Sequence, residues 1–407
     1  MTYDTLFFSL FRTDNPYSSI SLSMAKEIAR TNRVLYVNHP YSWKDLLKRG
    51  PVPRKRLPGL LLGRVQYETL PQIPNNFVAV TPPPTLPINW LPAGALYRFF
   101  QAWNNRIVLR AIRKALRDHG WQEYVYINCY NPFYASMLPE SMGAALQIYH
   151  CIDDITQDPY TDKHGTDLEI AAIRQADLTF VTSSNLKKLK QPYSDRIVLY
   201  FNAAAVGLFK TVLQGRFRRP AEMEGRTGKV IGFVGNLDAL RIDYPLLKKI
   251  ALAYPEHTLL LIGPINSREP AHIGLDQLPN VVWAGSRPLE SLPAYLQYMD
   301  CVLIPFLCNT LTASIYPLKI NEYLAAGKAV VSTAFSDDIQ GFAEYIYLAQ
   351  DHTAFIEQIE RALQENDPAM VQNRSALAET NSWAARVQQL WQEIDRVRGN
   401  HSKQAAA

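Results

Sequence analysis

Cysteines are scarce in this sequence, and a long apolar run is missing. Four cysteines occur in 407 residues, with neither a CxxC pair nor the ligand spacing of a zinc site. We therefore expect reduced, mostly buried thiols and no metal site. No stretch of about 18 or more apolar residues occurs, so we expect no membrane-spanning helix. The first segment lacks a basic n-region and a small-residue cleavage site, and we expect it to form the first strand of a cytoplasmic protein.

Two signatures of nucleotide-dependent enzymes are also absent. The GxGxxG fingerprint of dinucleotide sites does not occur, so no dinucleotide cofactor is expected. The neighbouring aspartates Asp153 and Asp154 do not have the DxD spacing that indicates a metal-bound sugar-nucleotide donor. The sequence thus gives no reason to expect a cofactor.

What is present indicates two α/β domains. Hydrophobic residues make up 47% of the chain and charged residues 19%, a globular composition, and the length suits two domains of roughly 150 to 200 residues each. Apolar runs alternate with amphipathic stretches, which predicts two doubly wound, largely parallel sheets. Strands are expected at 5–10, 33–38, 124–128, 146–151, 178–183, 197–202, 229–235, 258–263, 281–285, 301–306 and 329–333.

The stretch SIYPLKINEYLAAGKAVVST, which begins at Ser314, predicts a short helix with an unusual charge pattern. Pro317 suits the first helical position and Gly327 suits the exit, so we expect a helix over about 317–326. Lys319 in the first turn opposes the helix dipole, unless an anion binds at the helix start. Glu322, one turn later, could accept hydrogen bonds from both hydroxyls of a vicinal diol. A diphosphate beside a ribose fits both residues; the alternative is a solvated pair on an exposed helix.

Small and cationic residues follow three other predicted strands of the same half. Gly235 and Arg241 follow the strand at 229–235, Gly263 ends the next, and Gly285 and Arg287 end the third. Ligands of open parallel sheets bind at the carboxyl ends of the strands, so these residues indicate a nucleotide cleft. Taken alone, Gly235 is equally consistent with a tight turn.

These pieces in this order resemble the C-terminal, donor-binding half of the family 4 type GT-B glycosyltransferases. The resemblance covers about residues 175–400 and is closest to the bacterial branch with teichuronic-acid and exopolysaccharide glycosyltransferases. It implies an α/β GT-B fold: two Rossmann-like, doubly wound domains facing a central cleft. We assign residues 1–205 to an acceptor-binding domain and 206–375 to a nucleotide-sugar-binding domain. Residues 376–407 are expected to form a helix that crosses back to the first domain.

The resemblance also implies roles for individual residues. Glu322 would hold the nucleotide ribose, the helix start with Lys319 the donor diphosphate, and Arg241 would neutralise that diphosphate. Arg287 would lie near the base. Many relatives carry a glutamate eight positions before Glu322, where this chain has Ser314, so the sugar contact differs. The full set of expected nucleotide-sugar-binding residues is Gly235, Asn236, Arg241, Gly263, Arg287, Ser314, Pro317, Leu318, Lys319 and Glu322.

Catalytic candidates follow a strand of the first half, in the segment IYHCIDDI. Asp153 or Asp154 could orient or deprotonate an acceptor hydroxyl, and His150 could assist. The alternative is that these aspartates cap the following helix.

The first 120 residues are strongly basic. They hold 17 lysines and arginines against 6 aspartates and glutamates, whereas the net charge of the whole chain is only +5. Residues 95–120 predict a helix with its arginines on one side and most of its apolar residues on the other. With residues 44–56, this helix suggests a surface for an anionic membrane. The alternative is a core helix with a solvated basic face.

The expected function is transfer of a sugar from a UDP- or GDP-sugar to a hydroxyl of a glycan or lipid-linked acceptor. We expect retention of the anomeric configuration, no required metal, no nucleic-acid partner, and a role in cell-surface polysaccharide or glycolipid biosynthesis. The protein would be cytoplasmic and peripheral on the inner face of the membrane. Two alternatives remain: a GT-B sugar-nucleotide epimerase, and a non-catalytic protein that binds a nucleotide sugar or a membrane.

Overall fold

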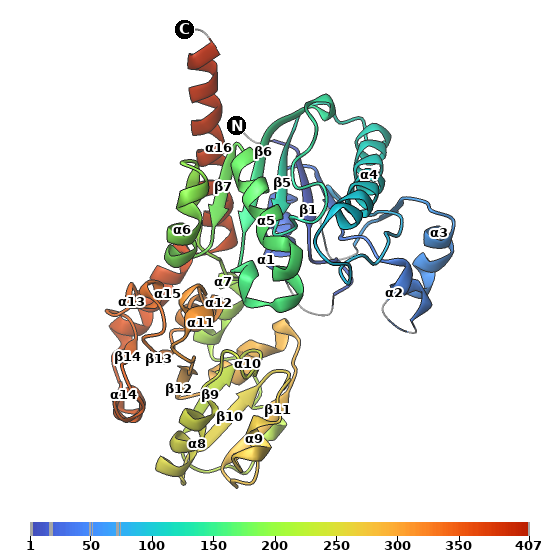
Figure 1. Ribbon diagram of the computed structural model, residues 1–407. Coiled ribbons are helices and arrows are strands. Elements are labelled where there is room, and N and C mark those ends of the chain that lie inside the picture. The colour runs from blue at the N-terminus through green and yellow to red at the C-terminus, as the bar shows by residue number, and fades with distance from the viewer. Residues whose placement is uncertain are drawn as a thin grey trace. The chain divides into compact units, whose positions relative to one another are not determined.

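The computed structural model (Figure 1) describes residues 3–15, 19–48, 50, 52–70, 73 and 75–405. The chain forms two compact units. The N-terminal unit comprises Met1–Thr182, Leu186–Tyr200 and Val387–Ala407, and the C-terminal unit comprises Ser183–Asn185 and Phe201–Arg386. The main division thus falls at residues 200 and 201, where the sequence predicted 205, and the chain returns to the N-terminal unit at Val387, where it predicted a separate segment from 376.

The N-terminal unit contains an eight-stranded sheet in the order β3-β4-β2-β1-β5-β6-β7-β8. All neighbouring strands are parallel except β3, which is antiparallel to β4. The strands are β1 (Thr5–Ser9), β2 (Val34–Val37), β3 (Gln66–Glu68), β4 (Phe77–Thr81), β5 (Tyr124–Cys129), β6 (Ala144–Cys151), β7 (Leu178–Val181) and β8 (Ile197–Leu199). The helices are α1 (Ile20–Ile28), α2 (Trp43–Leu47), α3 (Leu57–Leu61), α4 (Ala95–Asp118), α5 (Pro159–Gln175), α6 (Ser184–Lys190) and α16 (Trp383–Ala405).

The C-terminal unit contains a six-stranded, all-parallel sheet in the order β11-β10-β9-β12-β13-β14. The strands are β9 (Val230–Val234), β10 (Thr258–Ile262), β11 (Val281–Gly285), β12 (Cys301–Ile304), β13 (Ala329–Thr333) and β14 (Tyr347–Ala349). The helices are α7 (Val206–Lys210), α8 (Tyr244–Ala253), α9 (Glu269–His272), α10 (Leu292–Gln297), α11 (Thr310–Ala313), α12 (Leu318–Ala325), α13 (Asp337–Gln340), α14 (His352–Gln364) and α15 (Pro368–Thr380).

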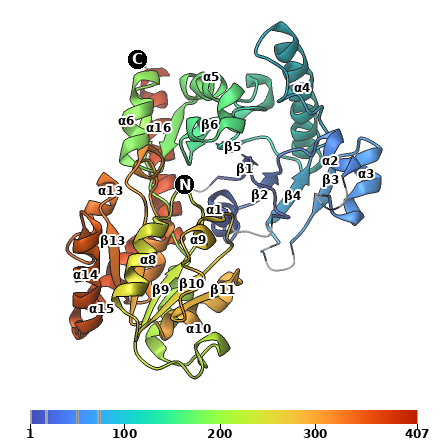
Figure 2. The ribbon, with the colours of Figure 1, turned by 60° about the horizontal axis from the view of Figure 1, so that its bottom comes forward.

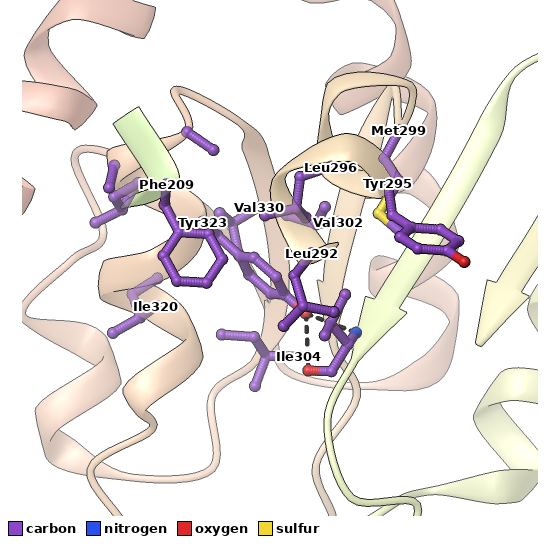
Figure 3. Close-up of a cluster of buried hydrophobic side chains, with 14 of the residues drawn as sticks. Phe209, Leu292, Tyr295, Leu296, Met299, Val302, Ile304, Ile320, Tyr323 and Val330 are labelled. Atoms are coloured by element: carbon purple, nitrogen blue, oxygen red, sulfur yellow. Dashed lines mark hydrogen bonds between the residues drawn. The ribbon is translucent and has the colours of Figure 1, made fainter. Parts of the chain in front are cut away.

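Both faces of the C-terminal sheet are buried, as the apolar strands require. Successive side chains of a strand point to opposite faces, so Val230 and Val234 of β9 join one core while Ile231 and Phe233 join the other. The first core contains residues of α10 and α12 and the second contains residues of α8 and α14. Figure 3 shows the first core.

These two sheets confirm the predicted α/β class and the two Rossmann-like domains. Every strand expected from the sequence is present, and β3, β4 and β14 are additional. The short helix predicted over 317–326 is α12, which spans Leu318–Ala325. Pro317 lies at its N-cap rather than at its first position, and Gly327 follows its end with φ +68°.

The helix predicted over 95–120 is present as α4, which spans Ala95–Asp118, but the predicted separation of its faces is wrong. Leu96, Phe99 and Trp103, which were expected opposite the arginines, are each more than half exposed. The buried face is formed instead by Tyr97, Asn104, Val108, Ala111, Ile112, Ala115 and Leu116.

Candidate functional site

The order of strands in the C-terminal sheet indicates where a ligand would bind. The chain runs outward from β9 through β10 to β11 and then restarts on the other side of β9 with β12. In open parallel sheets a ligand binds at such a reversal, outside the carboxyl ends of the two central strands. The loops after β9 and β12 are therefore the first place to look for a site.

These two loops are hydrogen-bonded to each other. The backbone N–H of Leu307 donates to Arg241 O at 2.8 Å, and that of Asp243 donates to Pro305 O at 2.9 Å. The side-chain amide of Asn309 donates to Leu240 O at 3.1 Å. Residues far apart in the sequence are thus fixed together at this edge of the sheet.

Arg241 has an unmet hydrogen-bonding capacity. Its Nε is buried and has no hydrogen-bond partner among the residues that the structure describes. A buried donor without an acceptor costs roughly 1–3 kcal/mol, and more when it is charged. An arginine fork is well suited to phosphate oxygens, so Arg241 is a candidate for binding an anionic group, and its contact with a donor diphosphate stays a prediction.

The strand-end glycines shape the same edge. Gly235 N donates to Ile262 O at 2.8 Å, and Gly263 N donates to Gly285 O at 3.0 Å. Gly263 has φ +147°, and a Cβ there would lie 1.7 Å from Gly235 O. Gly263 is therefore required by the close approach of two backbones. Asn236, next to Gly235, is exposed and accepts from Asn266 Nδ2 at 3.3 Å.

Helix α12 places Lys319 and Glu322 beside each other. The Lys319 ammonium lies 2.7 Å from Glu322 Oε2, with side-chain exposures of 24% and 10%. Tyr323, on the buried face of the helix, accepts from Val234 N at 2.8 Å and donates to Val234 O at 3.3 Å, which ties α12 to the end of β9 (Figure 3). The start of α12 at Pro317 and Leu318 has no side-chain cap and no acidic residue in its first turn. Its positive end is thus available to an anion.

Ser314 is buried just before this helix. Its Oγ accepts from Asn185 Nδ2 at 2.8 Å. Ser314 therefore occupies a fixed position in the C-terminal unit, and its contact with a donor sugar stays a prediction.

Arg287 belongs to a separate cluster. Its guanidinium forms an ion pair with Glu222, and its Nε donates to Tyr295 Oη at 2.7 Å. The Tyr295 hydroxyl in turn lies 3.2 Å from both oxygens of the Glu222 carboxylate. This cluster was not predicted because Glu222 lies 65 residues from Arg287 along the chain, in the short 3-10 helix Ala221–Met223, which contains no motif. A contact between Arg287 and a nucleotide base stays a prediction.

His150, in the N-terminal unit, is fully buried on β6. The Phe180 and Tyr200 rings meet it edge-on, and its Nδ1 lies 3.9 Å from Cys129 Sγ. Burial lowers the pKa of His150 to about 4, so the imidazole is neutral at neutral pH. This environment favours a structural role, and its catalytic role stays a prediction.

The two aspartates after β6 differ in their surroundings. Asp154 is buried, and its Oδ1 accepts from Thr156 N at 3.2 Å and from Thr156 Oγ1 at 2.9 Å. It caps the short 3-10 helix at Ile155–Gln157, which is the structural alternative considered for it. Asp153 is half-buried, and its backbone carbonyl accepts from Cys151 Sγ at 3.5 Å. A catalytic role for either stays a prediction.

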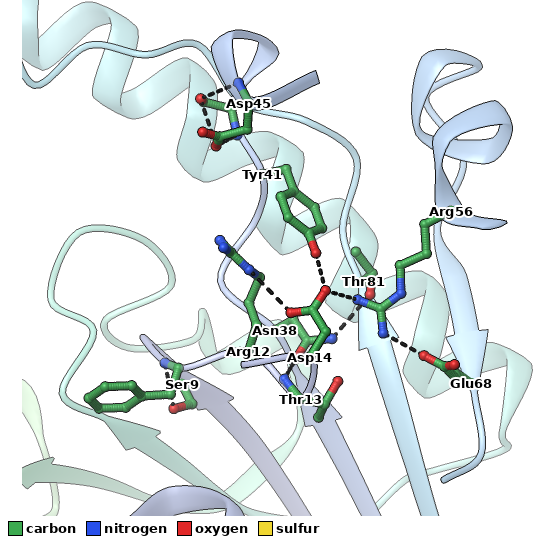
Figure 4. A network of polar contacts seen from close by, with 12 residues as sticks. Ser9, Arg12, Thr13, Asp14, Asn38, Tyr41, Asp45, Arg56, Glu68 and Thr81 are labelled. Carbon is green, nitrogen blue, oxygen red and sulfur yellow. Dashed lines mark hydrogen bonds and ion pairs between the residues drawn. The ribbon is translucent and has the colours of Figure 1, made fainter. Parts of the chain in front are cut away.

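A polar network that the sequence analysis did not find surrounds Asp14 (Figure 4). Its carboxylate accepts from Tyr41 Oη and from Arg56 Nη1, the latter at 3.0 Å, and lies 3.5 Å from Arg12 Nε. Arg56 is buried and also pairs with Glu68. These residues come from loops and short elements after β1 and β2, where no periodic pattern marks them. The network shows that a buried cation here is structurally compensated.

The comparisons with known proteins agree with this geometry. Residues 228–365 match the family described as glycosyl transferases group 1. This matched segment lies within the C-terminal unit and is similar to the group 1 glycosyltransferases. This match confirms the resemblance to family 4 type enzymes.

One related sequence and two solved structures extend the comparison. TuaH of Bacillus subtilis (strain 168), whose name assigns it to teichuronic acid biosynthesis as a glycosyltransferase, is 32% identical over 166 residues, 40% of this chain and 42% of TuaH. The chain thus matches less than half of this relative's length. The UDP-forming α,α-trehalose-phosphate synthase of Burkholderia vietnamiensis has 11% identity and a TM-score of 0.68 over 98% of this chain and 99% of its own. Anabaena HepE in complex with UDP has 14% identity and a TM-score of 0.63 over 97% of this chain and 100% of its own.

These structural similarities identify the fold as GT-B. Within the described ranges, no group of three or more His, Cys, Asp or Glu side chains could hold a metal ion. Nor does any helix of that part of the chain have the length and apolar character needed to cross a membrane.

Proposed function

We propose that this protein transfers a sugar from a nucleoside diphosphate sugar to an acceptor hydroxyl. The observation that carries the proposal is the set of residues in the loops after β9 and β12 and at the start of α12, within the segment that matches the group 1 glycosyltransferases. It combines the unpartnered Nε of Arg241 with the uncapped start of α12 and the Lys319–Glu322 pair. Together these groups suit an anion beside a diol.

In the proposed complex the donor diphosphate lies at the start of α12. The backbone amides there, the helix dipole and Lys319 stabilise negative charge, and Arg241 supplies its free N–H to a phosphate oxygen. Glu322 accepts from the ribose hydroxyls, which releases Lys319 to turn toward the diphosphate. Charge on the leaving diphosphate grows as the glycosidic bond breaks, so these cations stabilise the transition state more than the ground state.

The finer features of the proposal concern donor, acceptor and stereochemistry. The donor is a UDP- or GDP-sugar, and no metal is required because cationic side chains and the helix start neutralise the diphosphate. The reaction retains the anomeric configuration, and the departing diphosphate takes the acceptor proton. The acceptor is a glycan or lipid-linked sugar of a cell-surface polysaccharide or glycolipid, bound by the N-terminal unit. The protein works in the cytoplasm, peripheral on the inner face of the membrane.

The test is release of free nucleoside diphosphate from a panel of UDP- and GDP-sugars, with and without EDTA and with simple glycan and lipid-linked acceptors. We expect release with at least one donor, unchanged by EDTA. Glu322→Ala should weaken nucleotide binding in calorimetry by roughly 1.5 to 3 kcal/mol, because charge-assisted hydrogen bonds to the ribose are lost. Glu357→Ala, an exposed glutamate on α14, is the matched control. Unchanged nucleotide affinity in folded Glu322→Ala would remove Glu322 from the site.

The same panel separates the two alternatives. An epimerase converts the donor sugar into its epimer without needing an acceptor, which sugar analysis detects. A non-catalytic protein binds a nucleotide sugar and leaves it intact. Nucleotide binding without any turnover across the panel would therefore contradict the transferase.

A further inference from the structure

Helix α4 carries an unusual stripe of exposed residues. Leu96, Phe99 and Trp103 have exposed fractions of 57%, 62% and 53%. Continuing the same alternating steps of three and four along the helix, the next residues are Arg106, Arg110, Arg113 and Arg117, all exposed. With 3.6 residues per turn, these seven positions fall within about 100° of one another. One solvent-facing line of side chains is therefore apolar in its first half and basic in its second.

The charge of this helix is almost entirely of one sign. Its 24 residues include five arginines and Lys114 but a single acid, Asp118, which already pairs with Lys114 and accepts from Tyr67 Oη. In the part of the chain that the structure describes, no ion pair involves Arg106, Arg110 or Arg113. These cations are thus available to an external anionic surface.

More exposed apolar and basic residues occur near the two ends of the stripe. Trp90, just before α4, is 74% exposed. Around α2 and α3, exposed Leu47, Leu61 and Leu62 accompany exposed Lys44, Lys48, Arg54 and Lys55. Both views place α2 and α3 on the same side of the N-terminal unit as α4 (Figures 1 and 2). Of the basic segment expected at 44–56, residues 49 and 51 lie outside the described residues.

We propose that the stripe on α4, Leu96 to Arg117, docks the N-terminal unit obliquely on an anionic lipid bilayer. The end with Leu96, Phe99 and Trp103 enters the boundary between headgroups and acyl chains, where tryptophan is favoured. The arginines of the other end remain at the level of the lipid phosphates, their stems on the apolar surface and their guanidinium groups on the headgroups. A helix whose apolar and basic residues form two faces along its whole length lies parallel to the membrane surface. In α4 the apolar residues occupy one end and the arginines the other, which favours a helix tilted relative to that surface.

A second copy of the chain fits the stripe less well. Steps of three and four also occur in coiled coils, so self-association through α4 has to be considered. A parallel pair would place arginines against arginines. An antiparallel pair would place them against Leu96, Phe99 and Trp103, which leaves the cations without partners. Charge complementarity therefore favours anionic lipid.

Membrane docking through α4 rests on the proposed peripheral location of the protein. It does not depend on the proposed sugar transfer, because the residues proposed to bind the donor lie in the other unit. The experiment is cosedimentation of the full chain with vesicles of equimolar phosphatidylglycerol and phosphatidylcholine, and with phosphatidylcholine alone. We expect binding to the first, weaker binding to the second, and a decrease with salt. Arg106→Gln with Arg113→Gln should weaken binding to the anionic vesicles about 30-fold at low salt, given about 1 kcal/mol per basic residue and tenfold per 1.4 kcal/mol.

The apolar half is tested separately. Phe99→Ser with Trp103→Ser should lower binding roughly tenfold or more while the salt dependence is retained. Leu252→Ser, with the same exposed fraction as Leu96 but on α8, should bind like wild type. Thermal melting and UDP calorimetry accompany each variant, so a folding defect or a failed nucleotide site is seen independently of vesicle binding.

Three results would overturn the proposal: no binding of folded wild type to anionic vesicles, equal binding to both vesicle types, or wild-type binding by both double variants. A concentration-dependent dimer in analytical ultracentrifugation that Phe99→Ser with Trp103→Ser abolishes would assign the stripe to a second copy instead.

Discussion

At the scale of single residues, the hydrogen-bond partners distinguish two arginines that look alike in the sequence. Both Arg241 and Arg287 follow a strand of the C-terminal sheet, and both were assigned to the donor. Arg287 is satisfied by Glu222 and Tyr295, whereas Nε of Arg241 is buried without a hydrogen-bond partner in the described structure. Since an unpaired buried donor is costly, Arg241 has the stronger structural argument for a ligand.

The buried imidazole of His150 makes stability depend on pH. Burial holds its pKa at about 4, below the ordinary value of 6.5, so between these values the unfolded chain binds more protons than the folded one. Stability is therefore complete above about pH 6.5 and falls as the pH drops toward 4. Between about pH 7.5 and pH 5, the free energy of unfolding should therefore decrease by about 2 kcal/mol less in His150→Leu than in wild type.

Urea unfolding at the two pH values measures this difference. His272→Leu, at an exposed position on α9, is the control and should keep the wild-type slope. If His150→Leu has the same pH dependence as wild type, the pKa of His150 does not differ between the folded and unfolded states.

At the scale of elements, α12 combines a structural and a chemical requirement. Tyr323 and Ile320 pack its buried face against the sheet, which fixes the helix start beside the ends of β9 and β12. Lys319 in the first turn destabilises the helix by about 0.3 to 1 kcal/mol because it opposes the helix dipole. A partly exposed ion pair such as that with Glu322 stabilises it by a similar amount. Stability alone thus gives little reason for a lysine here.

Lys319→Met therefore tests the proposed role of the helix start. Without ligand, the free energy of unfolding should change by less than about 1 kcal/mol, because the two effects oppose each other. The rate of nucleoside diphosphate release should fall more than donor affinity, since the charge matters most in the transition state. UDP should also stabilise the variant less than wild type in thermal melting.

Lys249→Met, an exposed lysine on α8, controls for loss of a surface charge. If Lys319→Met is less stable without ligand yet keeps full transferase activity, Lys319 is a structural residue.

The elements also show what the sequence could and could not predict. Long apolar strands such as β5 and β9 were found because every residue in them is buried, which leaves a continuous apolar run. The strands β3 and β14 read QYE and YLA and lack a long apolar run, whereas the equally short β8 lies within the apolar stretch IVLYF; β4 was missed beside its proline-rich loop. The faces of α4 were misassigned because the sequence does not say which of two apolar stripes the sheet covers. The proximity of Lys319 and Glu322 on α12 could be predicted because one short motif contains both, whereas the Glu222–Arg287 pair depends on the tertiary fold.

At the scale of the whole molecule, the two units hold different parts of the proposed function. The residues proposed to bind the donor lie in the C-terminal unit, and the stripe on α4 lies in the N-terminal unit. Besides the short stretch Ser183–Asn185, the chain passes between the units near residue 200 and again within α16, which begins in the C-terminal unit at Trp383 and belongs to the N-terminal unit from Val387. In that second part Leu390 and Ile394 are fully buried, and Tyr3 packs against Trp391 with ring centroids 6.1 Å apart.

This arrangement predicts that a change late in the sequence acts on the first unit. Ile394→Ala removes a fully buried side chain and should destabilise the N-terminal unit by about 2 to 5 kcal/mol. Scanning calorimetry with and without UDP measures the effect, because a ligand of the C-terminal unit stabilises the unit that binds it. We expect the transition that UDP leaves unchanged to move to lower temperature. The affinity for UDP at about 25 °C should stay that of wild type. Gln392→Ala, exposed on the same helix, should leave both transitions in place. If Ile394→Ala instead lowers the UDP-sensitive transition or weakens UDP binding, the end of α16 supports the donor site, and the assignment of that segment to the N-terminal unit is wrong.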